Sequence, residues 1–214
     1  MLRRKPPKQR ARRLRNPEHT RKRLLKAAFQ EVYRSGFQSA SLDTILAATG
    51  VTKGALYYHF EGKEALGLAV VEEVIAVQNR DKWLRPLRSG GEPIETLINI
   101  VRGTLVSPEA VKGGCPLNNL AQEMSPLDEK FRKRLARIFQ AWQEGIATAL
   151  RRGQTQGTVR RDLDPDETSS FLIAMYEGYV SLAKSAQDVN VLKVGIRNIV
   201  GWLRSLQVPE NCRD

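Results

Sequence analysis

The side chains best placed for chemistry form a polar and aromatic run over residues 51–60, Val-Thr-Lys-Gly-Ala-Leu-Tyr-Tyr-His-Phe. Thr52 is a helix-capping residue type and predicts a helix that begins at the next residue. Lys53 could donate hydrogen bonds to a phosphate or to a guanine edge. Because Gly54 and Ala55 carry almost no side chain, such a helix could lie close to the bases of a major groove. The chemistry indicated is hydrogen bonding to DNA.

The residues before this run predict the elements that position it. Ser41 is expected to cap a short helix, and Gly50 suits a turn that needs a positive φ. A longer helix precedes the pair, beginning at Asn16-Pro17-Glu18 and ending at Gly36. Two capped short helices around a glycine turn are typical of a helix-turn-helix unit.

The distribution of charge also indicates a polyanionic partner. The chain of 214 residues has a formal net charge of +12. Residues 1–60 hold 14 basic and 3 acidic side chains, whereas residues 61–214 hold 21 and 20. Eight of the basic residues lie in 1–15, which we interpret as a disordered arm. Such an arm is either a solvating tail or a segment that lies along phosphates or enters a minor groove, with Arg12, Arg13 and Arg15 as contacts.

Composition excludes several classes of protein. No apolar run is long enough to span a bilayer, and no secretory leader is recognisable, so we expect a soluble cytoplasmic protein without a membrane partner. Cys115 and Cys212 cannot form a disulfide scaffold or a zinc site, and neither His19 nor His59 has a second ligand at metal spacing. No metal or cofactor is expected. An all-α enzyme is a weaker alternative because no nucleophile with a base and no phosphate loop is present.

The rest of the chain repeats apolar residues at helical spacing, without a convincing strand or internal repeat. The pattern predicts an all-α protein of about nine helices, one of which ends before Pro86. Leu105 is expected on the apolar stripe of the helix after it. The domain organisation expected is the arm at 1–15, a DNA-binding head at 16–66 and a second helical domain at 67–214.

One stretch carries a specific resemblance. Gly50-Val51-Thr52, then Leu56-Tyr57 with His59-Phe60, then Lys63-Glu64-Ala65-Leu66, resembles the DNA-binding head of the tetracycline-repressor (TetR) family, over roughly residues 18–66. The chain departs from the family at Leu46, where a small alanine is usual. We expect Gly54 and Ala55 on the facing helix to leave room for this leucine.

The resemblance implies DNA contacts along the recognition helix and at the helix starts beside it. Tyr57, Tyr58 and His59 would contact the groove wall and phosphates, and Lys63 would hold a further phosphate at the start of the next helix. The full set of expected DNA contacts is Arg12, Arg13, Arg15, Ser41, Thr44, Thr52, Lys53, Gly54, Ala55, Tyr57, Tyr58, His59 and Lys63.

The resemblance also implies an obligate homodimer built on the last two helices. The apolar stripe over residues 189–206 and a double stripe over 171–186 are too wide for one buried face, which agrees with this implication. The double stripe consists of Phe171, Met175, Gly178 and Leu182 beside Leu172, Tyr176, Tyr179 and Ala183.

Family members carry a small-molecule pocket in the second domain, and its occupant moves the heads out of register. Residues expected to border it, each equally compatible with packing or a surface position, are Cys115, Asn118, Asn119, Gln122, Trp142, Tyr176, Glu177 and Lys184. Cys115 precedes a short helix, whose N-terminus would lower the pKa of a thiol, and Lys184 could stabilise the thiolate. Cys115 is therefore a candidate sensor of electrophiles, the alternative being a small buried thiol, whereas Cys212 is expected to be inert.

The function predicted is a sequence-specific transcriptional regulator, a repressor released from a palindromic operator by a small-molecule or thiol-reactive effector. The alternatives are an activator of the same architecture, an all-α enzyme and a non-specific nucleic-acid-binding protein.

Overall fold

The computed structural model describes residues 17–209. The expected all-α fold is confirmed there, since the only β pairing among these residues is the isolated bridge Val159–Gln207. The basic arm with Arg12, Arg13 and Arg15, the cap at Asn16 and Cys212 lie outside the described residues. The elements are α1 (Pro17–Ser35), α2 (Leu42–Thr49), α3 (Lys53–His59), α4 (Lys63–Val70), η1 (Val71–Ile75), α5 (Ala76–Asn79), η2 (Arg80–Leu84), α6 (Arg85–Arg88), α7 (Pro93–Arg102), α8 (Pro108–Gly113), α9 (Pro116–Met124), α10 (Glu129–Thr155), α11 (Pro165–Ala186) and α12 (Val189–Ser205).

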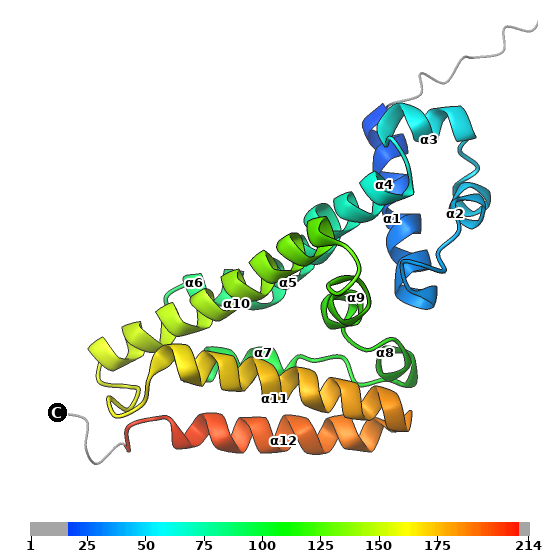
Figure 1. Cartoon of the computed structure of the whole chain (residues 1–214). Coiled ribbons are helices and arrows are strands. Elements are labelled where there is room, and N and C mark those ends of the chain that lie inside the picture. The colour runs from blue at the N-terminus through cyan, green and yellow to red at the C-terminus, as the bar shows by residue number, and fades with distance from the viewer. Residues whose placement is uncertain (1–16, 210–214) are drawn as a thin grey trace, which may run out of the picture.

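Helices α1, α2 and α3 gather at one end of the molecule, and α11 and α12 lie side by side along the opposite edge (Figure 1). The local signals for the head are confirmed. The Ser41 side chain accepts a hydrogen bond from the Thr44 amide at 3.4 Å, and the Thr52 side chain accepts one from the Ala55 amide at 3.3 Å. Gly50 has a φ of 61° and donates its N–H to the Leu46 carbonyl at 2.8 Å. The turn between α2 and α3 therefore has the predicted geometry.

The packing expected around Leu46 is wrong in one respect. A Cβ added to Gly54 would have no atom within 4 Å, so no side chain occupies the space beside this glycine. Leu46 is half-buried and packs against the main hydrophobic core. The larger residue is accommodated by that core, and Gly54 stays open at the surface.

The helix predicted to end before Pro86 runs on to Arg88. Segments α4, η1, α5, η2 and α6 follow one another without a break as a single rod beside α10 (Figure 1). The five residues before Arg85 form a π-helical turn, and the Arg85 amide donates to the Arg80 carbonyl. A π turn is wider than an α turn, which relieves the crowding that a proline ring causes one turn earlier in a regular α-helix. The boundary expected after residue 66 falls inside this rod.

Helices α7 to α12 form the body of the molecule, and α7 is buried there on several sides. Ile94, Leu97, Ile98 and Val101 have no exposed surface, because α7 packs against α10, α12 and the end of the rod. Leu105 was predicted to join this apolar stripe, and the prediction is wrong. Since α7 ends at Arg102, Leu105 lies outside the helix and is 71% exposed.

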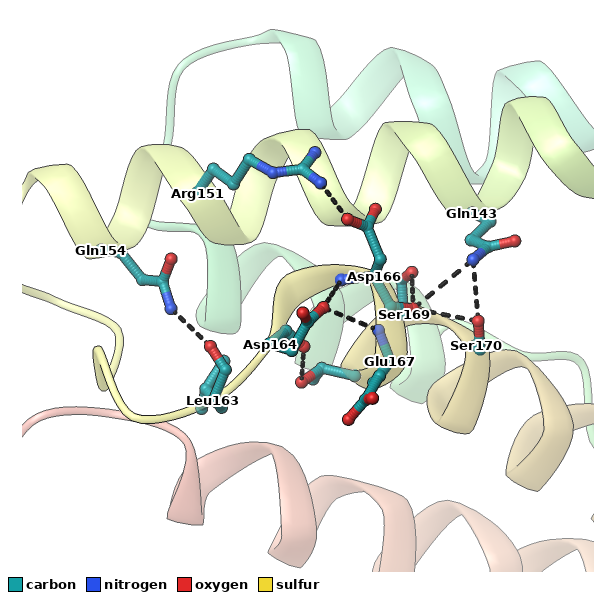
Figure 2. Close-up of polar contacts among 10 residues, drawn as sticks. Gln143, Arg151, Gln154, Leu163, Asp164, Asp166, Glu167, Ser169 and Ser170 are labelled. Carbon is teal, nitrogen blue, oxygen red and sulfur yellow. Dashed lines mark hydrogen bonds and ion pairs between the residues drawn. The ribbon is translucent and has the colours of Figure 1, made fainter.

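A polar network fixes the start of α11 against α10 (Figure 2). Asp164 caps α11, because its Oδ1 accepts hydrogen bonds from the amides of Asp166 at 2.7 Å and Glu167 at 3.1 Å. Asp166 forms an ion pair with Arg151 of α10. Gln143, two turns earlier on α10, donates to the Ser170 hydroxyl at 2.8 Å. These contacts set the position of α11, on which three of the predicted pocket residues lie.

The head joins the body at the turn Phe37–Gln38. The backbone amides of both residues donate to the Glu123 carboxylate of α9 at 2.8 Å each. The Phe37 ring packs on Phe131 of α10, with centroids 4.6 Å apart, and a Cβ added to Gly67 of α4 would lie 2.3 Å from that ring. Three elements of the body and rod therefore hold this one turn.

We expect Glu123→Ala to loosen the head without unfolding the chain. The substitution removes two charge-assisted hydrogen bonds, each worth about 1.5–3 kcal/mol, from amides that lie near solvent. Hydrogen exchange at the Phe37 and Gln38 amides should accelerate at least tenfold, while exchange in α7 stays unchanged. Glu129→Ala, which removes an exposed carboxylate of α10, is the matched control. Equal protection of the turn in the two variants would show that Glu123 does not hold it.

Candidate DNA-binding surface and ligand cavity

Helix α3 presents its predicted contact residues on an open surface. Tyr57 is 48% and Tyr58 77% exposed, and Thr52, Lys53 and Gly54 are exposed as well. Large apolar side chains at the surface of a short helix indicate a binding surface. The opposite face of α3 is held in the core by Leu56 and, at its C-cap, by Phe60, both buried as packing residues.

The remaining predicted contacts differ in their surroundings. Thr44 is exposed, whereas Ser41, Ala55 and His59 are half-buried. The His59 ring stands edge-on to Tyr58, with centroids 5.0 Å apart. Lys63 begins α4 as expected, yet its ammonium donates to the Gln38 carbonyl at 2.8 Å and lies 5.2 Å from the centre of the Phe37 ring. Lys63 thus has a role in the head–body joint in addition to the phosphate contact expected of it.

Sequence reasoning missed the part that α1 plays at this surface. A hollow of about 310 Å³ lies between the start of α1 and α3, lined by Thr20 and Arg23 together with Thr52 and Tyr58. Arg23 also donates to the Thr49 carbonyl at the end of α2. The basic cluster Arg21-Lys22-Arg23 was the available signal, because a basic stretch at the start of a capped helix near a recognition helix adds to the same electrostatic footprint.

The body contains a cavity of about 230 Å³ between the rod, α10, α11 and the α8–α9 turn. Four of the eight predicted pocket residues line it: Cys115, Trp142, Tyr176 and Glu177. The other four, Asn118, Asn119, Gln122 and Lys184, line a wider surface hollow of about 600 Å³ between α1 and α9. The structure therefore divides the predicted set between two places.

The cavity also holds polar side chains from the rod and from the α7–α8 loop that the sequence pattern did not indicate. Lys82 donates to the Tyr176 hydroxyl at 2.5 Å, and the hydroxyls of Tyr176 and Thr104 are 3.2 Å apart. The Lys82 ammonium lies 4.6 Å from the centre of the Tyr176 ring and 5.3 Å from that of Trp83. The sequence did not indicate that Lys82 lines a cavity. A lysine four residues before Pro86, in a helix predicted to end there, is expected at the surface.

Three aromatic rings make the apolar wall of the cavity. Trp83 lies 4.7 Å from Trp142 and 5.1 Å from Tyr176, measured between ring centres. Trp83 and Trp142 are at most 2% exposed, so these contacts also form the centre of the body's core. These three residues belong both to the cavity wall and to the core. A compound in the cavity would therefore contact the side chains that pack the rod, α10 and α11 together.

The surroundings of Cys115 differ from those expected of an activated thiol. The backbone amides at the start of α9 do lower the pKa of Cys115. Burial and the nearby Glu177 carboxylate outweigh them and raise that pKa to about 12. Lys184 does not reach the thiol, because its ammonium donates to the Asn119 side chain at 2.9 Å. These surroundings favour the alternative, a small thiol that packs among its neighbours.

We therefore expect Cys115 to react slowly with iodoacetamide. A cysteine with a pKa near 12 holds on the order of a thousandfold less thiolate at about pH 8 than a free cysteine of pKa about 8.5. In a Cys212→Ser background, alkylation followed by mass spectrometry should be slower by a similar factor in the folded protein than in urea. The rate should rise about tenfold per pH unit up to about pH 10. Fast labelling of the folded protein at neutral pH would contradict the raised pKa.

Of the residues that the structure describes, no cluster of His, Cys, Asp and Glu could hold a metal ion. No described helix has both the length and the apolar character needed to cross a membrane.

Comparison with known proteins identifies the family. Residues 24–70 match the sequence model of the bacterial regulatory proteins of the tetR family, and residues 93–199 match that of a tetracyclin repressor-like C-terminal domain. The chain is 33% identical over 161 residues to the HTH-type transcriptional repressor DhaR of Mycobacterium sp. strain GP1, covering 75% of this chain and 80% of DhaR. It is 32% identical over 181 residues to an HTH-type transcriptional regulator of Lactococcus lactis, covering 83% and 90%.

A solved TetR transcriptional regulator from Chloroflexus aurantiacus superposes with a TM-score of 0.78 at 27% identity, covering 91% of this chain and 98% of that one. The match extends through both the head and the body, as the two family models do. This chain therefore belongs to the TetR family of DNA-binding transcriptional regulators.

Proposed function

We propose that the protein is a homodimeric repressor that leaves a palindromic operator when a small compound occupies the 230 Å³ cavity. One observation carries this proposal. The hydroxyl of Tyr33, on α1 of the head, donates at 2.9 Å to the carbonyl of Gly114, in the turn that lines the cavity. A change in the cavity wall would therefore reach the head through one direct hydrogen bond.

A second contact supports the same route. Helix α9 begins at the cavity, with Pro116 and Leu117 in its wall, and carries Glu123 near its other end. Glu123 accepts both amides of the Phe37–Gln38 turn. A shift of α9 along its axis would change the position of that turn, so Tyr33 and Glu123 would act on the same end of α1.

Two heads at a fixed separation would place α3 of each subunit in successive major grooves. On this proposal Lys53 and Tyr57 contact DNA, and Tyr58 contacts it beside the hollow lined by Arg23. An effector that binds the DNA-free form ten times more tightly than the DNA-bound form would weaken operator binding by about 1.4 kcal/mol.

The dimer would use the outer faces of α11 and α12. The double stripe predicted on α11 separates into an inner row with Leu172 and Ala183 buried and an outer row with Phe171 and Leu182 exposed by 51% and 59%. On α12, Val194 is 38% exposed. Gly178 and Gly201 add two open positions at which a partner helix could approach closely. A second copy would cover this apolar surface isologously.

The first experiment measures fluorescence anisotropy on the DNA directly upstream of the protein's own gene, with excess competitor DNA. Competitor-resistant binding to one palindrome supports the proposal, whereas salt-dependent binding without sequence preference would favour a non-specific nucleic-acid-binding protein. A promoter fusion then separates repressor from activator, because deletion of the gene should raise expression from the operator if the protein is a repressor.

Lys53→Ala should weaken operator binding by one of two measurable routes. If Lys53 contacts a phosphate, affinity should fall for all sequences and the slope of log K against log salt should decrease by about 1. If it contacts a guanine, the preference for one base pair should be lost, at a cost of about 1–3 kcal/mol. Lys133→Ala removes an exposed lysine of another helix, α10, and is the control. Operator affinity equal in the two variants would exclude Lys53 from the interface.

Leu182→Arg should convert the dimer to monomers, since it places a charge in the apolar surface of the proposed interface. Sedimentation velocity at micromolar concentration is the measurement, with Leu127→Arg as control because Leu127 is 59% exposed on the α9–α10 turn, away from α11 and α12. The circular dichroism spectrum should be unchanged in both variants. A dimer that persists in Leu182→Arg would place the interface elsewhere.

A further inference from the structure

Two buried polar groups of the cavity have no hydrogen-bond partner among the described residues, and they are of opposite kind. The indole N–H of Trp142 is a donor, and both carboxylate oxygens of Glu177 are acceptors. Trp142 is 1% and Glu177 7% exposed, and both side chains line the cavity. Buried polar groups are nearly always hydrogen-bonded, so an unpartnered donor and an unpartnered acceptor in one cavity indicate a ligand that supplies both partners.

The Cys115 thiol does not satisfy the Glu177 carboxyl group. It lies close enough to Glu177 for each group to shift the pKa of the other. Hydrogen bonding between the thiol and the carboxyl group contributes to both shifts, but a thiol is a weak donor with one proton, whereas a carboxylate has about four acceptor sites. Neither carboxylate oxygen has a partner of full hydrogen-bond geometry within residues 17–209. The carboxyl group keeps accepting capacity for a ligand.

The volume and the walls limit the rest of the ligand. An apolar cavity of about 150 Å³ holds benzene, and sites for drug-sized compounds start at about 300 Å³. At about 230 Å³, the cavity suits one substituted ring. Trp83, Trp142 and Tyr176 offer ring faces and edges against which an aromatic ring would pack.

The charges of the cavity favour an uncharged ligand. A cation would lie in the same small cavity as the Lys82 ammonium, which is already held by Tyr176. An anion would lie beside Glu177, where burial raises the pKa of the carboxyl group although Cys115 and Lys82 act in the opposite direction. The same burial disfavours a second negative charge in this cavity. A hydroxyl group fits both requirements, since it donates to a carboxyl oxygen in either protonation state and accepts from an indole N–H.

We propose that the cavity binds an uncharged compound of about one aromatic ring whose hydroxyl substituents give a donor to Glu177 and an acceptor to Trp142, that is, a phenol or an aromatic alcohol. The proposal rests on the proposed function, because it names the class of effector for the same cavity.

The test is a calorimetric titration of the full-length protein with four one-ring probes: p-cresol, toluene, benzoate and benzylammonium. Toluene differs from p-cresol only by the hydroxyl group. We expect p-cresol to bind at least tenfold more tightly than toluene, and both charged probes to bind more weakly than p-cresol. Toluene binding as tightly as p-cresol, tighter binding of a charged probe, or no saturable binding of any probe would each overturn the proposal.

Two variants locate the polar contacts. Glu177→Leu removes the acceptors and Trp142→Phe removes the indole N–H while keeping a ring, so in each the ratio of the p-cresol to the toluene affinity should fall severalfold, with toluene binding retained. An unchanged ratio in both variants would overturn the assignment of these residues. Should either variant fail to fold, the four-probe series on the wild-type protein still decides the ligand class.

Operator binding, measured on the same preparation, separates this proposal from the previous one. Specific operator binding without p-cresol binding rejects the ligand class and keeps the repressor. Binding of p-cresol without specific operator binding keeps the ligand class and rejects the repressor. Release of the operator by p-cresol but not by toluene supports both.

Discussion

The Glu123 carboxylate holds the turn at which the head meets the body. It accepts the two amides of the Phe37–Gln38 turn, which is the place where α1 changes direction toward α2. The Phe37 ring fills the space beside Gly67, where any side chain would collide with it. Because one turn is held by α4, α9 and α10 together, the orientation of α3 is fixed by groups that belong to the body. The DNA-binding surface is therefore an outcome of packing at this joint as much as of the helix-turn-helix sequence.

The signals that could be predicted from sequence are local ones. Three capping residues lie within three residues of the amides that they bond: Ser41, Thr52 and Asp164. Gly50 acts on its own backbone. Each can therefore be recognised without knowledge of the fold. The double stripe of α11 could be recognised because it depends only on spacing within one helix. Its inner row is mainly buried and its outer row mainly exposed in the structure.

The partners of long side chains were not predictable, because they depend on which elements meet. Lys63 lies at the expected helix start but bonds Gln38, Lys184 bonds Asn119 instead of approaching the thiol, and Lys82 enters the cavity from a rod that continues past a proline. At Cys115, two effects on the pKa of the thiol oppose each other. The helix N-terminus acts on its pKa in the expected direction, yet burial, which no local pattern reveals, acts more strongly in the other.

The continuous rod has a consequence for how a signal would travel. A flexible linker after residue 66 would let the head move independently, but α4 passes into η1 and α5 without a break, so the head and the cavity wall share one helical element. Helix α1, at 19 residues, is roughly 28 Å long. Its far end, at Tyr33, contacts the α8–α9 turn, whereas its start, near Thr20, lies beside α3. On the proposed mechanism, a small displacement at the Tyr33 end would tilt the whole helix and move α3 by a larger distance. A rigid helix held at one end converts a sub-ångström shift there into a larger displacement at the other end. A compound in the cavity could therefore alter the separation of the two heads of a dimer without a large rearrangement of either subunit.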